Sequence, residues 1–171
     1  GNAYENLIYE GYGPAGVAVL CDVLTDNRNR TASEIRYIFS RNGGSLGESG
    51  CVAWMFDRKG KMIIDMEDRD EDEMMLLALE AGAEDFSTDG EEGEIITATD
   101  TLESVREAFI AAGIEPVSAE ISMIPQNTVA ITEVGQAQTM MRLIEALEDN
   151  DDVQNVYANF DISDEIMEQL D

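Results

Sequence analysis

Short strand-like runs alternate with helix-length segments along this chain, and this alternation constrains the fold more than any other feature. Val17–Leu24 is an apolar run broken only by Asp22, which is typical of a buried strand. Thr31–Glu34 reads T-A-S-E, a capping box with Thr31 as N-cap, and apolar residues then recur at helical spacing until Gly43 and Gly44. The pattern continues in the same manner to about residue 160 and predicts the α+β class.

The predicted element order indicates two small lobes, which the 171 residues allow. Residues 17–66 read β-α-β-β, with a strand pair turning at Arg58–Gly60; residues 67–126 read α-β-β-α-β, and the remainder reads α-β. A β-α-β-β-α-β order is the ferredoxin-like split unit. We therefore expect two ferredoxin-like (split β-α-β) lobes, the second inserted into the first. Residues 1–66 plus 127–171 form a discontinuous lobe and 67–126 an inserted acidic lobe; the alternative is one larger mixed sheet.

The charge is large and uneven. The chain holds 37 acidic and 10 basic residues and no histidine, giving a net charge of -27. Residues 1–61 contain seven of each sign, so the whole excess follows residue 61. A chain this acidic should not coat a nucleic-acid backbone or an anionic membrane, although its neutral part could meet a polyanion locally. Without histidine there is no catalytic triad, and among so many acids no pair stands out as catalytic. We expect a non-enzyme with no catalytic residues.

No metal or cofactor site is predicted. Cys21 and Cys51 lie in apolar contexts without a CxxC pattern, as expected of buried reduced thiols. Asp68, Asp70 and Asp72 imitate the start of a calcium loop, but the sixth and twelfth positions lack the required Gly and Glu. A helix N-cap explains these acids better.

The Gly11–Gly16 segment matches G-x-G-x-x-G letter for letter. The dinucleotide fingerprint needs a strand before it and a helix after it, whereas here a strand is predicted to follow. Two interpretations remain open. The segment is either a glycine-rich turn leading into the first strand, or a rigid loop that displays Tyr9 and Tyr12 for stacking.

The one basic feature with a chemical rationale is D-N-R-N-R-T at Asp26–Thr31. Arginine forks and the free N–H groups of a helix start both suit phosphate, and the arginines at 36 and 41 lie off the apolar stripe. The alternative is ordinary solvated arginines paired with Asp26 and Glu34. The candidate nucleic-acid-binding residues are therefore Asn27, Arg28, Asn29, Arg30, Arg36 and Arg41, with Tyr9 and Tyr12 as stacking candidates.

Four blocks of this sequence strongly resemble the YebC/PmpR family, whose mitochondrial branch is the translational activator of cytochrome oxidase subunit I. They are Tyr9–Gly16 (YEGYGPAG), Leu24–Thr31 (LTDNRNRT), Gly43–Gly47 (GGSLG) and Gly50–Phe56 (GCVAWMF), in the order of the family. The family commonly has glycine where Ala15 stands. Its members also begin with a basic helical domain, opening with a His-Ser-Lys-Trp type motif, that is absent from this chain.

The resemblance implies a three-domain protein of which this chain is the second (discontinuous) and third (inserted) domain. It implies a non-enzymatic cytoplasmic regulator of gene expression, mitochondrial in the eukaryotic branch. Its members are DNA-binding transcriptional regulators or ribosome-associated translation factors. The nucleic-acid partner, DNA or ribosomal RNA, would be held mainly by the missing N-terminal domain. No cofactor, membrane or small-molecule substrate is expected. The alternative is an acidic interaction module that docks basic, for example ribosomal, proteins.

Overall fold

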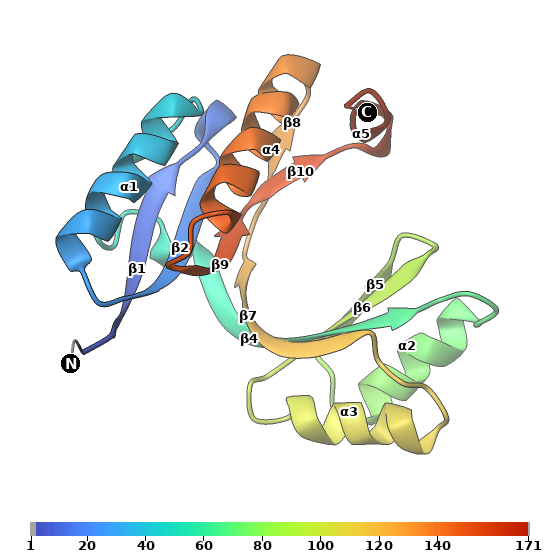
Figure 1. Cartoon of the computed structure of the whole chain (residues 1–171). Helices are drawn as coiled ribbons and strands as arrows, with labels where there is room; N and C mark the ends of the chain where they lie inside the picture. The colour runs from blue at the N-terminus through green and yellow to red at the C-terminus, as the bar shows by residue number, and fades with distance from the viewer. Residues whose placement is uncertain (1–2, 171) are drawn as a thin grey trace. The chain divides into compact units, whose positions relative to one another are not determined.

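The computed structural model describes residues 3–170, which form two compact units (Figure 1). Unit 1 combines the chain up to Phe56 with the chain from Pro125 onward, and unit 2 is the intervening Asp57–Ile124. Each unit pairs helices with a mostly antiparallel sheet. The expected fold class, α+β with a second small lobe inserted into the first, is confirmed.

Unit 1 is built on a four-stranded sheet of order β3-β1-β2-β9. Helices α1 and α4 contact each other and pack on the sheet through strands β1 and β9, and Figure 1 shows both on the same side of it. A short parallel pair, β8 with β10, and helix α5 complete the unit. The bounds are β1 (Glu5–Tyr12), β2 (Ala18–Thr25), α1 (Arg28–Arg41), β3 (Ser45–Leu46), β8 (Val129–Ile131), α4 (Val134–Glu148), β9 (Val153–Ala158), β10 (Phe160–Ile162) and α5 (Asp164–Glu168).

The core of unit 1 follows from the alternation along β2. Val19, Cys21 and Val23 are fully buried in one cluster with Ile35 and Phe39 of α1. Burial raises the pKa of the Cys21 thiol to about 12, so it is a packing residue rather than a nucleophile. Cys51 is also a free thiol but is only half-buried.

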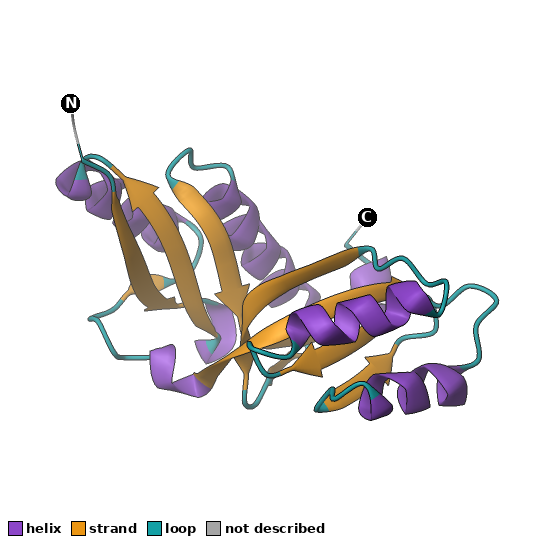
Figure 2. Ribbon diagram, turned by 90° about the horizontal axis from the view of Figure 1, so that it is seen from below, coloured by secondary structure: helices purple, strands orange, loops and turns teal. Residues whose placement is uncertain are grey.

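Unit 2 carries the split β-α-β arrangement in full. Its sheet has the order β5-β6-β4-β7, and both helices contribute to one core with the sheet. Figure 2 shows these two helices on one side of that sheet. The bounds are β4 (Phe56–Asp65), α2 (Glu71–Glu80), β5 (Asp85–Thr88), β6 (Glu92–Thr97), α3 (Leu102–Ala111) and β7 (Ser118–Pro125).

Strand β4 corrects two expectations about the chain between residues 51 and 66. The predicted strand pair turning at Arg58–Gly60 is instead the single strand β4, preceded by a 3-10 turn, η2 (Ala53–Met55). Gly60 serves close packing, because a Cβ there would collide with Thr97 and Leu102. Since β4 lies between β6 and β7, unit 2 begins after Phe56 rather than at the expected boundary of residue 66.

The glycine-rich segment lies between two strands. A strand that the sequence did not predict, β1, ends at Tyr12, and a 3-10 turn, η1 (Pro14–Gly16), leads directly into β2. The helix of a dinucleotide fingerprint is therefore missing, as expected. Ala15 and Gly16 both have left-handed backbone, with φ of 63° and 78°. Glycine suits both positions, which explains how this turn accommodates the family's usual residue at position 15.

Candidate nucleic-acid interface

Helix α1 begins earlier than the sequence predicted, and this changes the proposed anion site. Its N-cap is Asn27, whose Oδ1 accepts a hydrogen bond from the backbone N–H of Arg30 at 3.1 Å. Thr31 is not a cap; it is buried, and its hydroxyl bonds Thr25 at 2.7 Å and Asp152 at 2.8 Å. Arg28 and Arg30 therefore lie in the first helical turn, and the expected cradle of free N–H groups in front of Thr31 does not form.

Arg30 is held by carboxylates of unit 1. Its guanidinium bonds Asp152 Oδ2 at 2.9 Å and lies 3.7 Å from Asp26 and 3.8 Å from Glu34. Glu34 and Asp152 line an open hollow of about 390 Å³ together with Asp149 and Asp151. Such an acidic surrounding repels phosphate, so for Arg30 the alternative interpretation of a paired arginine fits the structure.

The Arg30–Asp152 contact gives a pH-dependent prediction. The hydrogen bond from Arg30, supported by that from Thr31, lowers the pKa of Asp152 below its ordinary 3.8. A carboxyl group with a lowered pKa stabilises the folded protein at pH values above its ordinary pKa. This stabilisation is lost as the pH falls through the pKa of the folded state. Asp152→Asn should therefore lower the Tm at neutral pH, and the difference should shrink below pH 4. Thermal unfolding at a series of pH values measures this difference in Tm, and Asp151→Asn is the charge-matched control. An equal decrease in Tm in both variants would contradict a special role for the Arg30–Asp152 contact.

Arg28 and Asn29 remain at the surface. Arg28 forms one exposed ion pair, with Glu5 at 3.0 Å, which contributes little and is easily exchanged for another anion. Asn29 is exposed on the same turn. Arg28 and Asn29 are accessible to a ligand, whereas Arg30 is already paired with Asp152.

The two tyrosines proposed for stacking do not form a common platform. Tyr9 lies in β1, is half-buried, and packs against the core of unit 1. Burial raises the pKa of its phenol, as expected for a packing residue. Tyr12, three residues later in the same strand, is 36% exposed and pairs in register with Ala18. Because strand residues three apart point to opposite faces, the structure separates these rings.

The middle and end of α1 present a basic and aromatic surface that we call the arginine–tyrosine face: Arg36, Tyr37 and Arg41. All three are exposed, and Tyr37 is 63% exposed. The Arg41 guanidinium lies over the Tyr37 ring, 5.9 Å from its centroid. Within residues 3–170 neither Arg36 nor Arg41 forms an ion pair. Sequence reasoning found the two arginines but missed Tyr37, although its i,i+4 spacing to Arg41 was visible.

Beyond Glu34, the surface of α1 carries no acid. The exposed side chains that run along α1 are Arg28, Asn29, Ser33, Arg36, Tyr37, Ser40 and Arg41, besides the engaged Arg30. The one acid of the helix, Glu34, is half-buried and accepts a hydrogen bond from Asn150 at 2.9 Å. In a chain of net charge -27, this helix surface is locally positive and can meet a phosphate backbone.

A buried carboxylate organises a second exposed aromatic residue that sequence reasoning missed. Glu10 is 5% exposed and accepts hydrogen bonds from the backbone N–H groups of Gly50, Val52 and Ala53. This fixes the loop before η2, which presents Trp54 with 65% of its surface exposed. The Trp54 indole donates to the carbonyl of Cys51 at 3.1 Å.

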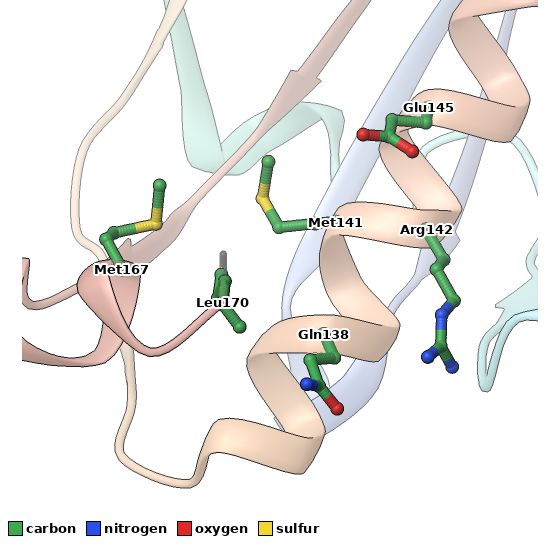
Figure 3. A pocket seen from close by; sticks show the side chains of 6 residues that line it. All are labelled: Gln138, Met141, Arg142, Glu145, Met167 and Leu170. Carbon is green, nitrogen blue, oxygen red and sulfur yellow. The ribbon is translucent and has the colours of Figure 1, made fainter.

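A further hollow of unit 1 lies between α4 and α5 and has a volume of about 340 Å³. Met141, Met167 and Leu170 lie between the two helices there, and Gln138, Arg142 and Glu145 of α4 complete the lining (Figure 3). Within the described part of the chain, no group of three or more His, Cys, Asp or Glu residues is placed to hold a metal ion. None of the helices described there is long and apolar enough to cross a bilayer.

Comparisons with known proteins agree on one family. The model of the TACO1/YebC second and third domain matches residues 4–160. A "Probable transcriptional regulatory protein" of Syntrophus aciditrophicus is 55% identical over 99% of this chain and 68% of its own length. One of the same name from Pelotomaculum thermopropionicum is 57% identical over 96% of this chain and 68% of its own. The crystal structure of the conserved hypothetical protein Aq1575 from Aquifex aeolicus has a TM-score of 0.87 at 44% identity, covering 98% of this chain and 69% of that one.

Proposed function

This chain belongs to the TACO1/YebC family, and on that premise we propose that it is a non-enzymatic regulator of gene expression that contacts nucleic acid through helix α1. The observation that carries the proposal is the part of α1 that follows Glu34, which carries no acid. Within residues 3–170 Arg36 and Arg41 form no ion pair there, and Tyr37 lies beside them. Arginine forks bind phosphate, and an exposed aromatic ring stacks on bases. The names of the relatives, probable transcriptional regulatory proteins, support a regulatory role.

The proposed contact is a local one. The chain as a whole repels a polyanion, so α1 adds orientation and a few phosphate contacts to an affinity supplied elsewhere in the family's longer proteins. In this scheme unit 1 corresponds to the second domain of the family and unit 2 to the third. We place the protein in the cytoplasm, with DNA or ribosomal RNA as its partner.

Two assays run in parallel test this function. Cosedimentation with ribosomes and binding to promoter DNA are measured for the protein and for its Arg36→Glu, Arg41→Glu double variant. The proposal expects at least one association to occur and to weaken in the variant. The association that weakens identifies the target as ribosomal or transcriptional. Variant and wild type behaving alike in both assays would exclude a nucleic-acid role for α1.

The aromatic residue of the arginine–tyrosine face gives a separate prediction. Tyr37→Ala should weaken binding of a single-stranded oligonucleotide about tenfold, because base–aromatic stacking contributes about 1–3 kcal/mol per base. Tyr37→Phe keeps the ring and should bind like the wild type. Fluorescence anisotropy with a labelled oligonucleotide measures both; equal losses in the two variants would show that the hydroxyl, rather than stacking, matters.

A further inference from the structure

Helix α2 of unit 2 carries two apolar stripes, of which only one is covered. Met74 and Ala78 are buried in the core of unit 2. On the outer side, Met75, Leu76 and Leu79 are 36%, 58% and 48% exposed. A helix that covers a sheet normally has a polar outer side, so a second apolar stripe on that side indicates that a further surface packs there.

The three exposed residues form one continuous stripe. Positions 75 and 79 are separated by four residues and positions 76 and 79 by three, so their side chains are neighbours on the helix surface. We call Met75, Leu76 and Leu79 the outer α2 stripe. It is not required by the core of unit 2, which is complete on the opposite side of the helix.

Carboxylates surround the outer α2 stripe. Glu71, Asp72 and Glu73 occupy the first turn of α2, and Glu80 lies one turn beyond Leu76. Within residues 3–170 none of these acids takes part in an ion pair. Residues 57–124 as a whole hold 20 acidic and five basic residues. The apolar stripe therefore lies in a strongly negative and uncompensated field.

We infer that the outer α2 stripe is a docking surface for a basic amphipathic segment of a partner protein. Charge complementarity selects this occupant. Nucleic acid and an anionic membrane would be repelled, and a second copy of this chain would bring its own excess of acids to the contact. A helix or extended segment with apolar residues on one side and lysine or arginine beside them satisfies both the stripe and its acidic rim. This inference is independent of the nucleic-acid role proposed for α1.

Fluorescence anisotropy with a labelled synthetic helix, leucine on one face and lysine on the other, tests the inference on the whole chain. A peptide of the same composition in scrambled order keeps the charge but not the apolar face. The variant is Leu76→Asn with Leu79→Asn, both outside the core, and its fold is checked by circular dichroism. Leu24→Asn with Ile8→Asn is the matched control, because these residues are exposed on the sheet of unit 1.

The expected result is saturable binding of the amphipathic peptide that weakens about tenfold in the α2 variant and is unchanged in the control. Replacing the lysines of the peptide by glutamine should weaken binding as well. Four outcomes overturn the inference: no binding, equal binding of the scrambled peptide, equal binding by the α2 variant, or undiminished binding of the neutral glutamine peptide. Equal binding of the scrambled peptide would show nonspecific charge attraction, and tight binding of the neutral peptide would show an apolar partner without basic selectivity.

Discussion

Glu10→Gln is expected to lower the free energy of unfolding by about 2–3 kcal/mol, since a buried charged acceptor of several hydrogen bonds is replaced by an amide. The Glu10 carboxylate accepts hydrogen bonds from three backbone N–H groups, those of Gly50, Val52 and Ala53. A glutamine offers one oxygen, and its NH₂ group would face donors instead of acceptors. The loop that presents Trp54 should loosen first.

The same site has a defined pH dependence. Burial alone would raise the pKa of the Glu10 carboxyl, but the three N–H donors outweigh burial and hold the pKa below its ordinary 4.5. The stabilisation from Glu10 is therefore fully present above pH 4.5 and is lost as pH falls through the lowered folded value. The difference in the free energy of unfolding between the wild type and Glu10→Gln should therefore become smaller in that acidic range.

Urea unfolding followed by Trp54 fluorescence measures both effects. Trp54 is the only tryptophan of the chain and lies next to the loop that Glu10 fixes. Glu48→Gln, an exposed acid in the same loop, is the matched control and should be nearly neutral. If Glu10→Gln lowers the free energy of unfolding no more than Glu48→Gln does, the Glu10 carboxylate does not organise this loop.

Reversing the charge of the arginine–tyrosine face should produce the second large effect. The Arg36→Glu, Arg41→Glu variant is expected to weaken binding of single-stranded nucleic acid about 10- to 100-fold at low salt. Loss of two phosphate contacts should also reduce the slope of log affinity against log salt by about 1.4. Both arginines are exposed and off the core stripe, so the fold should remain intact.

The control for this experiment changes the net charge by the same amount elsewhere. Arg106→Glu with Arg142→Glu alters one residue in α3 and one in α4 and leaves α1 itself unchanged. A general electrostatic effect would weaken binding equally in both double variants. A loss confined to the α1 variant would assign the contact to that helix, whereas equal losses would contradict the assignment.

Sequence reasoning predicted the elements whose determinants are local. The helix capped by Asp70 and the apolar run of β2 depend on neighbouring residues, and both form where expected. Strand β1 was missed because Glu10 interrupts its apolar pattern, and the N–H groups that satisfy Glu10 lie about forty residues away in the chain. A buried polar residue of this kind looks like a loop residue until its partner is known.

The candidate site shows the same limit. Exposure of Arg36 and Arg41 followed from the position of the apolar stripe, and the structure agrees. The pairing of Arg30 with Asp152 could not be predicted from the sequence pattern, because 122 positions separate the two residues in the chain. The start of α1 was misplaced for a related reason: the Thr31 hydroxyl that resembles a cap is used by Thr25 and Asp152.

Photo-crosslinking from α1 tests the central claim most directly. A photoreactive amino acid replaces Ser40, which is exposed between Tyr37 and Arg41, and in a second protein replaces Ser104, which is exposed on α3. With labelled single-stranded RNA or DNA at low salt, the account predicts a crosslink from position 40 that competitor nucleic acid removes, and none from position 104. A crosslink from position 104 without one from position 40 would contradict it.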